Sequence, residues 1–150
     1  AGKPDRTVQA VHTAAGFGLT LAASIGALFL IIPTLLLRAF GMTDPIVLDL
    51  GVQLMRYLAV SGLFITVALA YTGGLQGTGD TKSPMYISFV SQIFIPLGMC
   101  LLIRTFSTLD PGDIWLAIVV GHFTRATLSV SVFRRERWRS IRVAVGSAEA

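Results

Sequence analysis

The chain has 150 residues, of which 53% are hydrophobic and only 13% charged, and its mean hydropathy is +0.73. Soluble domains carry about 25% charged residues, so this composition indicates a membrane protein. The net charge of +4 could indicate a nucleic-acid partner, but most of the basic excess lies in residues 134–142, beside the last apolar segment. Because such arginines are attracted to anionic lipid, we expect the lipid bilayer, and no nucleic acid, as the partner.

The first uncharged segment covers residues 14–37, and a bilayer takes about 20 apolar residues to cross as a helix. Pro4 suits the first turn of a helix that leads into this span. Pro33 lacks an amide hydrogen for the carbonyl of Phe29, so it should bend or loosen the last turn. Residues 1–13 are expected to be the interior of a longer chain.

A second helix is expected to start at Asp44 and Pro45, as N-cap and first helical residue, and to span the membrane at about 53–76. Asp110–Pro111 or Asp113 can start the last span, at about 112–133. Residues 1–143 then form one unit of four transmembrane helices. We expect the tail at 144–150 to be disordered.

The third span is expected at about 84–104. Ser83 and Pro84 repeat the signature of a cap followed by a proline. Pro96 interrupts this span and should free the carbonyl of Gln92. A side-chain amide and an unpaired carbonyl would then lie at the same depth in the membrane.

The distribution of basic residues predicts the orientation. Four crossings put the N-terminal segment, the loop at 77–84 and the tail on one side, with the basic residues Lys3, Arg6, Lys82, Arg134, Arg135, Arg137, Arg139 and Arg142. The other side has Arg38, Arg56 and Arg104. By the positive-inside rule the first side, with the C-terminus, is cytoplasmic.

Near the middle of the last span, His122 and Arg125 share one face with Ser129, at spacings i, i+3 and i+7. An Arg at the centre of a spanning helix costs about 2.5–3.5 kcal/mol on insertion scales and usually faces a bundle interior or a wet cavity. All acidic residues fall outside the apolar spans, so we expect the partner of Arg125, or the cavity it faces, in helices of the same protein that this sequence lacks. His122 could relay protons. The alternative interpretation of Arg125 is a structural residue whose charge is compensated by backbone carbonyls and water, and that of His122 is a residue that only donates a hydrogen bond.

Further candidates for a substrate pathway are Gln92, and Tyr57, Ser61 and Thr72 on one side of the second span. Such a pathway would suit a small cationic or aromatic substrate. Interhelical hydrogen bonding explains these side chains as well, since such bonds contribute roughly 0.6 kcal/mol each in membranes.

The loop between the second and third spans contains Gly77, Gly79, Asp80, Lys82 and Pro84 in the run GGLQGTGDTKSPM. The two glycines permit backbone angles closed to other residues, and the aspartate can accept bonds from nearby amides. We therefore expect a tight cytoplasmic turn. A phosphate-binding loop is excluded because the run lacks the Gly-Lys-Ser/Thr ending and follows a helix rather than a strand.

Three stretches resemble the multidrug and toxic compound extrusion (MATE) family: AGKPDRTVQAV, FGMTDPIVLDLGVQLMRYL and GGLQGTGDTKSPMY. The resemblance implies a secondary active transporter of about twelve helices in two lobes, which exports cationic or aromatic compounds in exchange for Na⁺ or H⁺. The chain would supply helices three to six of one lobe, and the basic tail suggests the C-terminal lobe. The resemblance also implies a multi-pass protein of the cell inner membrane.

One departure concerns ion coupling. Some family members have a carboxylate in the fourth helix of the lobe, and residues 57–76 contain none. The site of the coupling ion is therefore expected outside this chain. A structure of this piece alone should show a one-sided groove that is a cut surface rather than a drug site.

Two alternatives remain open, namely a lipid-linked oligosaccharide flippase of the same superfamily and a small four-helix membrane protein with a structural or interaction role. A flippase should have more cationic residues in its cavity than Arg125 alone. The few His, Cys and acidic residues show no metal-ligand or triad spacing, and Cys100 is the only cysteine. No metal, no cofactor and no enzymatic activity are expected.

Overall fold

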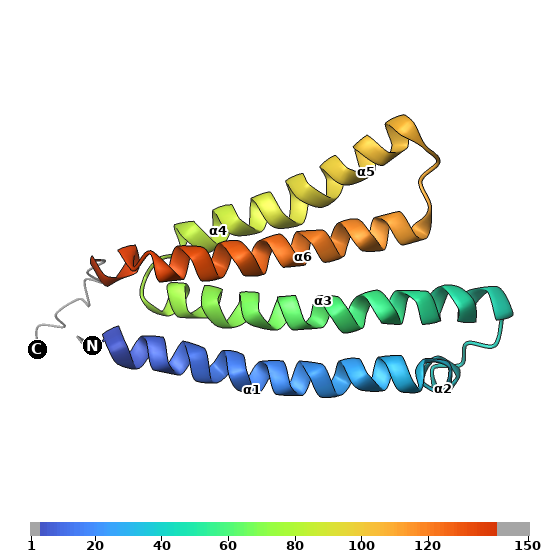
Figure 1. The fold of residues 1–150 in the computed structure, drawn as a ribbon, viewed down its shortest axis with the longest axis horizontal. Helices are drawn as coiled ribbons and strands as arrows, with labels where there is room; N and C mark the ends of the chain where they lie inside the picture. The colour runs from blue at the N-terminus through green and yellow to red at the C-terminus, as the bar shows by residue number, and fades with distance from the viewer. Residues whose placement is uncertain (1–3, 141–150) are drawn as a thin grey trace, which may run out of the picture.

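The computed structural model describes residues 4–140, and its secondary structure in that range is entirely helical (Figure 1). The elements are α1 (Pro4–Ile31), α2 (Pro33–Ala39), α3 (Pro45–Gly77), α4 (Lys82–Phe89), the π-helical turn η1 (Val90–Phe94), α5 (Ile95–Phe106), α6 (Pro111–Arg134) and the 3₁₀ turn η2 (Arg137–Ser140). Four stretches are long and apolar enough to cross a membrane: α1, α3, α4–η1–α5 together, and α6. The expectation of an all-α membrane protein with four spans is confirmed, whereas the predicted tail at 144–150 lies outside the described residues.

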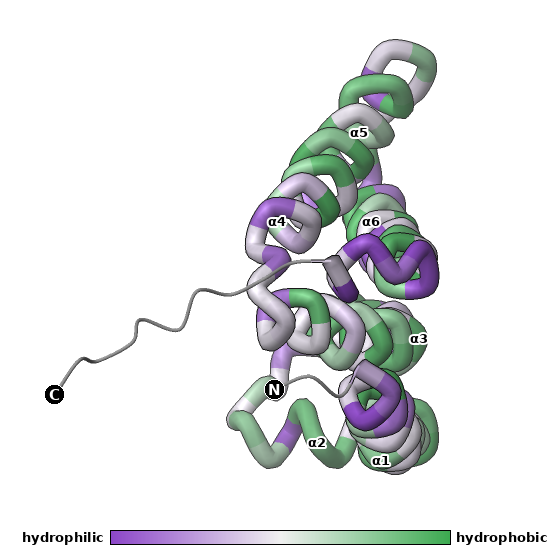
Figure 2. The backbone as a smooth tube through the Cα atoms, turned by 90° about the vertical axis from the view of Figure 1, so that its left-hand side faces the viewer, coloured by the Kyte–Doolittle hydropathy of each residue, from purple (hydrophilic) through white to green (hydrophobic). Residues whose placement is uncertain are grey.

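The four spans lie in a single row. α1 packs on α3, α3 on α6, and α6 on α4, η1 and α5. Figure 2, seen from the end that carries both termini, shows this order from α1 to α5. A row one helix thick leaves broad apolar faces uncovered, so Phe17 is 76% and Phe94 67% exposed. Lipid tails are as apolar as these side chains, so such faces suit a bilayer and would be unfavourable in water.

Two helix starts follow the capping residues that the sequence predicts. The Asp44 side chain accepts hydrogen bonds from the amides of Ile46 at 2.8 Å and Val47 at 3.2 Å. α6 begins at Pro111, and the Asp110 amide donates to the Asp113 carboxylate at 3.1 Å. Both aspartates proposed for this start therefore take part in it, Asp110 as the N-cap residue and Asp113 as the acceptor for the Asp110 amide.

The structure differs from two other predictions, which concern Ser83 and Pro33. Ser83 is not the N-cap of the third span, because α4 already begins at Lys82 and Thr81 is its N-cap. The Asp80 side chain accepts from the Ser83 amide at 3.0 Å, so the capping oxygen comes from the loop aspartate. At Pro33 the helix breaks rather than bends, since Ile32 leaves the helical region with φ −128° and ψ 43°.

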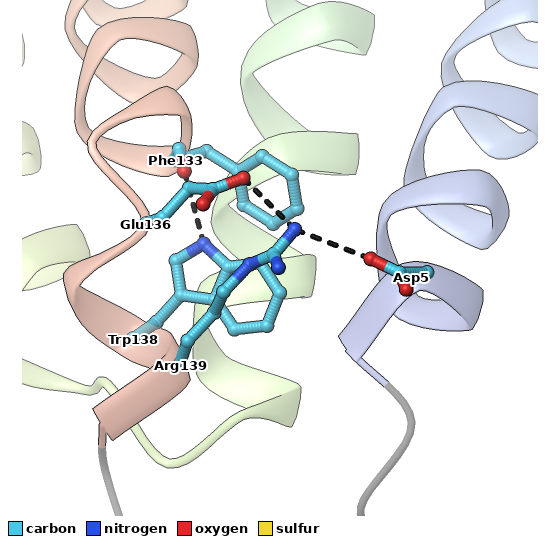
Figure 3. A network of polar contacts seen from close by, with 5 residues as sticks. All are labelled: Asp5, Phe133, Glu136, Trp138 and Arg139. Atoms are coloured by element: carbon cyan, nitrogen blue, oxygen red, sulfur yellow. Dashed lines mark hydrogen bonds and ion pairs between the residues drawn. The ribbon is translucent and has the colours of Figure 1, made fainter.

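At the end that carries the termini, the row closes into a small apolar core with members from α1, α3, α4, α6 and η2: Val11, Leu75, Ile87, Phe133 and Trp138. The Trp138 ring stacks on Phe133 with centroids 5.1 Å apart. Its Nε1 donates to the Phe133 carbonyl at 2.9 Å, so the indole is both buried and hydrogen-bonded (Figure 3). The segment after the last span is thus folded back against the helices.

Charged side chains surround this core. The Arg139 guanidinium lies 2.8 Å from the Glu136 carboxylate and 3.4 Å from that of Asp5, at the start of α1 (Figure 3). Glu136 has φ +55°, a left-handed conformation that turns the chain back after α6. We call Asp5, Phe133, Glu136, Trp138 and Arg139 the terminal clasp. It connects the start of the first span to the end of the last.

Candidate functional site

Pro96 changes the hydrogen bonding where α4 meets α5. The Ile95 amide donates to the Val90 carbonyl, five residues back, so the Ser91 carbonyl loses the donor that an α-helix would supply. Pro96, the next donor in this register, has no amide hydrogen. The turn therefore leaves the Ser91 carbonyl without a helical donor, in addition to the effect predicted for the carbonyl of Gln92.

Gly121 brings this turn against α6. A Cβ at position 121 would lie 2.5 Å from the Ser91 carbonyl oxygen and 3.0 Å from Cγ of Pro96. Carbon and oxygen atoms in close contact are about 3.3–3.6 Å apart, so a side chain at this position would push η1 and α6 apart. The Ser91 hydroxyl is fully buried and donates to the Ile87 carbonyl at 2.6 Å.

This close approach brings two of the predicted pathway residues together. Nε2 of Gln92 lies 3.5 Å from Nδ1 of His122, at the long limit of a hydrogen bond between side chains thirty residues apart in sequence. Both side chains are partly exposed. The pair forms the polar contact between the third and fourth spans.

Arg125 follows His122 by three residues on the same face of α6. Its Nε is buried and has no hydrogen-bond partner among the described residues. The ion pairs in the described part of the chain all belong to Arg139. Ser129, fully buried, donates to the Arg125 backbone carbonyl at 2.7 Å. We call Gln92, His122 and Arg125 the polar cluster.

The other three pathway candidates lie on α3 and do not join this cluster through any hydrogen bond of the described residues. The Thr72 hydroxyl donates to the Ala68 carbonyl at 2.6 Å, and that of Ser61 to Leu58 at 3.4 Å. Both side chains are buried. Their hydroxyls thus bond to their own helix and not to a neighbouring one.

Tyr57 lies near the start of α6. Its ring is 5.9 Å from that of Trp115, and a Cβ on Gly112 would lie 3.8 Å from its hydroxyl. The same Cβ would lie 3.1 Å from the side-chain nitrogen of Gln53. Tyr57 therefore belongs to an aromatic and amide contact between α3 and α6 at the opposite end of the spans from the terminal clasp.

The glycine-rich loop forms a tight turn. Gly79 adopts φ +92°, whereas Gly77 is the last residue of α3 and has no positive φ, so the predicted need for glycine holds at position 79 and not at 77. The Asp80 amide donates to the Leu75 carbonyl at 3.0 Å, and its carboxylate caps α4. Lys82 is exposed and Pro84 buried. The loop residues thus join two helices and form no cradle for a ligand.

An apolar groove of about 520 Å³ runs between α1 and α3. Its walls include Gly18, Leu21 and Phe29 on one side and Gly62 and Thr66 on the other. Thr66 is the one hydroxyl-bearing residue lining the groove, and it donates to the Gly62 carbonyl at 2.8 Å. The groove offers no free polar group for recognition, so we do not place it in the pathway.

Comparison with known proteins identifies the family, because the sequence profile described as MatE matches residues 1–102. The chain belongs to the MatE family. It is 21% identical over 137 residues to a probable multidrug resistance protein NorM of Thermotoga maritima, an alignment that covers 91% of this chain and 29% of the relative. It is also 29% identical over 140 residues to the multidrug resistance protein MdtK of Pectobacterium atrosepticum, covering 89% of this chain and 30% of the relative.

This MatE chain thus spans less than a third of the length of these curated relatives. No solved structure matches it. The profile match ends inside α5, so α6 with His122 and Arg125 lies beyond the residues that establish membership of the MatE family. The resemblance predicted from the three sequence stretches is confirmed.

Sequence reasoning did not identify three contributors to this region, namely Ser91, Gly121 and Trp115. Gly121 directly precedes His122, and a glycine in a membrane helix often permits close helix contact. The Ser91 carbonyl depends on the π turn, which Pro96 permits but does not specify. The pairing of Trp115 with Tyr57 depends on the register between α3 and α6, which neither residue reveals.

Proposed function

We propose that this chain is part of a multidrug efflux transporter that exports cationic or aromatic compounds in exchange for Na⁺ or H⁺. The observation that carries the proposal is the match to the MatE family, together with the relatives named as multidrug resistance proteins. Four apolar helices with uncovered faces support the same conclusion. Such transporters work by alternating access, in which one half of the molecule rocks against the other around a central site.

Within this proposal, the end of the row that carries the terminal clasp is cytoplasmic, and the membrane is the cell inner membrane. That end has six described basic residues, Arg6, Lys82, Arg134, Arg135, Arg137 and Arg139, whereas the other end has Arg38, Arg56 and Arg104. The positive-inside rule supports this orientation. The glycine-rich loop from Gly77 to Pro84 then forms a cytoplasmic turn.

We assign the polar cluster to the substrate pathway. Tyr57 belongs to the same pathway, at the end of the spans opposite the terminal clasp. The buried Ser61 and Thr72 on α3 complete the set of pathway residues. The apolar segments 14–37, 57–76, 85–103 and 114–133 contain no carboxylate. A carboxylate that binds the coupling ion must therefore belong to residues outside these segments. His122 remains available as a proton carrier.

The test is efflux by the full-length protein. A bacterial strain that lacks its main drug efflux pumps, expressing the protein, should accumulate less ethidium than the same strain with an empty vector. Collapse of the ion gradients should abolish the difference. Equal accumulation with and without the protein, at verified membrane expression, would contradict the efflux function.

A further inference from the structure

Arg125 is the single charged residue in the four apolar segments 14–37, 57–76, 85–103 and 114–133. The seven acidic residues of the described chain lie in loops or close to helix ends: Asp5, Asp44, Asp49, Asp80, Asp110, Asp113 and Glu136. None of them pairs with Arg125. A guanidinium at this depth is unfavourable unless an anion or other acceptors compensate its charge.

Within the polar cluster, Arg125 carries the donors that have no partner among residues 4–140. The guanidinium of Arg125 presents five N–H groups in a planar fork, and none makes a hydrogen bond within the described residues. Its Nε is buried and makes no hydrogen bond within the described residues. Gln92 and His122 lie 3.5 Å apart and remain partly exposed. The Ser91 carbonyl, a potential acceptor, is covered by Gly121.

A planar fork of donors binds a carboxylate in a bidentate manner, whereas a positively charged group would be repelled. We propose that the polar cluster binds a carboxylate group of the transported substrate, with Arg125 as the charged contact and Gln92 and His122 as neighbouring hydrogen-bonding groups. The inference rests on the proposed efflux function and specifies which part of a substrate this segment recognises. A cationic group of the same substrate is bound elsewhere.

Other sources of a partner for Arg125 predict a different outcome. A carboxylate side chain from another helix would make Arg125 a structural residue, and its loss would then affect all substrates alike. A substrate carboxylate makes the effect depend on the substrate. The discriminating quantity is therefore a ratio of two transport rates measured on one protein sample, which does not depend on the expression level.

The experiment uses the full-length protein in proteoliposomes and two probes, a rhodamine dye with a free carboxylate and the methyl ester of the same dye. In the Arg125→Gln variant, kcat/KM for the acid should fall about tenfold or more relative to the ester, because a hydrogen bond to a charged group is lost. Arg125→Lys, which keeps the charge, should restore part of the preference. The matched control Arg135→Gln, at the exposed end of α6, should keep the wild-type ratio.

An acid-to-ester ratio in Arg125→Gln equal to that of the wild type would overturn the inference, whether both rates fall or neither does. That result would leave the efflux function intact, since both dyes would still be transported by the wild-type protein. Failure of the wild-type protein to move either dye would overturn the efflux function and this inference with it.

Discussion

Replacing Gly121 by alanine should separate the third span from the fourth. The added methyl carbon would lie 2.5 Å from the Ser91 carbonyl oxygen, which belongs to backbone and cannot rotate away. Reaching an ordinary contact of 3.3 Å or more requires a displacement of about 1 Å between η1 and α6. Overpacking of this kind costs about 1–3 kcal/mol of unfolding free energy.

Alanine also has a higher helix propensity than glycine, by about 1 kcal/mol, which opposes the steric cost. Gly98→Ala in α5 is the matched control, since a Cβ there meets no atom within 4 Å. The difference in unfolding free energy between the two variants should therefore isolate the steric cost, at about 1–3 kcal/mol. Displacement should also move Gln92 beyond hydrogen-bonding distance of His122, since their 3.5 Å separation is already at the limit.

The assay is unfolding of the full-length protein in detergent, followed by tryptophan fluorescence for wild type, Gly121→Ala and Gly98→Ala. The close packing of η1 on α6 predicts that Gly121→Ala is the least stable of the three. If Gly121→Ala proved as stable as Gly98→Ala, the contact between Ser91 and Gly121 would not exist in the protein, and the argument for the position of the polar cluster would fail.

Three further predictions concern the ends of the helices. Gly79→Ala should lower the unfolding free energy by about 1–2 kcal/mol because φ is +92° there, whereas Gly77→Ala, in helical backbone and open space, should not; equal effects in the same detergent assay would contradict this. Trp138→Ala should cost about 3–5 kcal/mol and Trp138→Phe less, since phenylalanine keeps the stacking and loses the bond to the Phe133 carbonyl; an unchanged melting temperature for the alanine variant would show that η2 does not pack. In a cysteine-free background, Ser140→Cys should resist an impermeant maleimide applied to intact cells and Ser107→Cys should react, and the reverse pattern would refute the proposed orientation.

The starts of the helices were largely predictable because their determinants are local. Asp44 followed by Pro45 specifies a cap through atoms within three residues, and the structure contains those bonds. Ser83 followed by Pro84 has the same appearance, yet Asp80 caps α4. The turn at Gly79 places the Asp80 carboxylate within hydrogen-bonding distance of the Ser83 amide. A motif of two residues cannot show which of two nearby oxygens the loop will favour.

Contacts between helices were less predictable. Gln92 and His122 were each identified as pathway candidates, but their meeting depends on the π turn and on Gly121, which together set the register between two spans. Ser61 and Thr72 carry the same kind of polar group and bond to their own helix instead. Hydropathy locates a side chain at a depth in the membrane, but it does not indicate which neighbour that side chain will face.

The terminal clasp has a practical consequence for work on this protein. Trp138 and Arg139 follow α6 in sequence, and both lie against α1: Trp138 shares the apolar core with Val11, and Arg139 pairs with Asp5. A truncation or fusion made directly after Arg134 would remove the indole from the core and leave Asp5 without its cation. A reporter intended to leave the helices undisturbed should therefore keep residues 135–140 attached to α6.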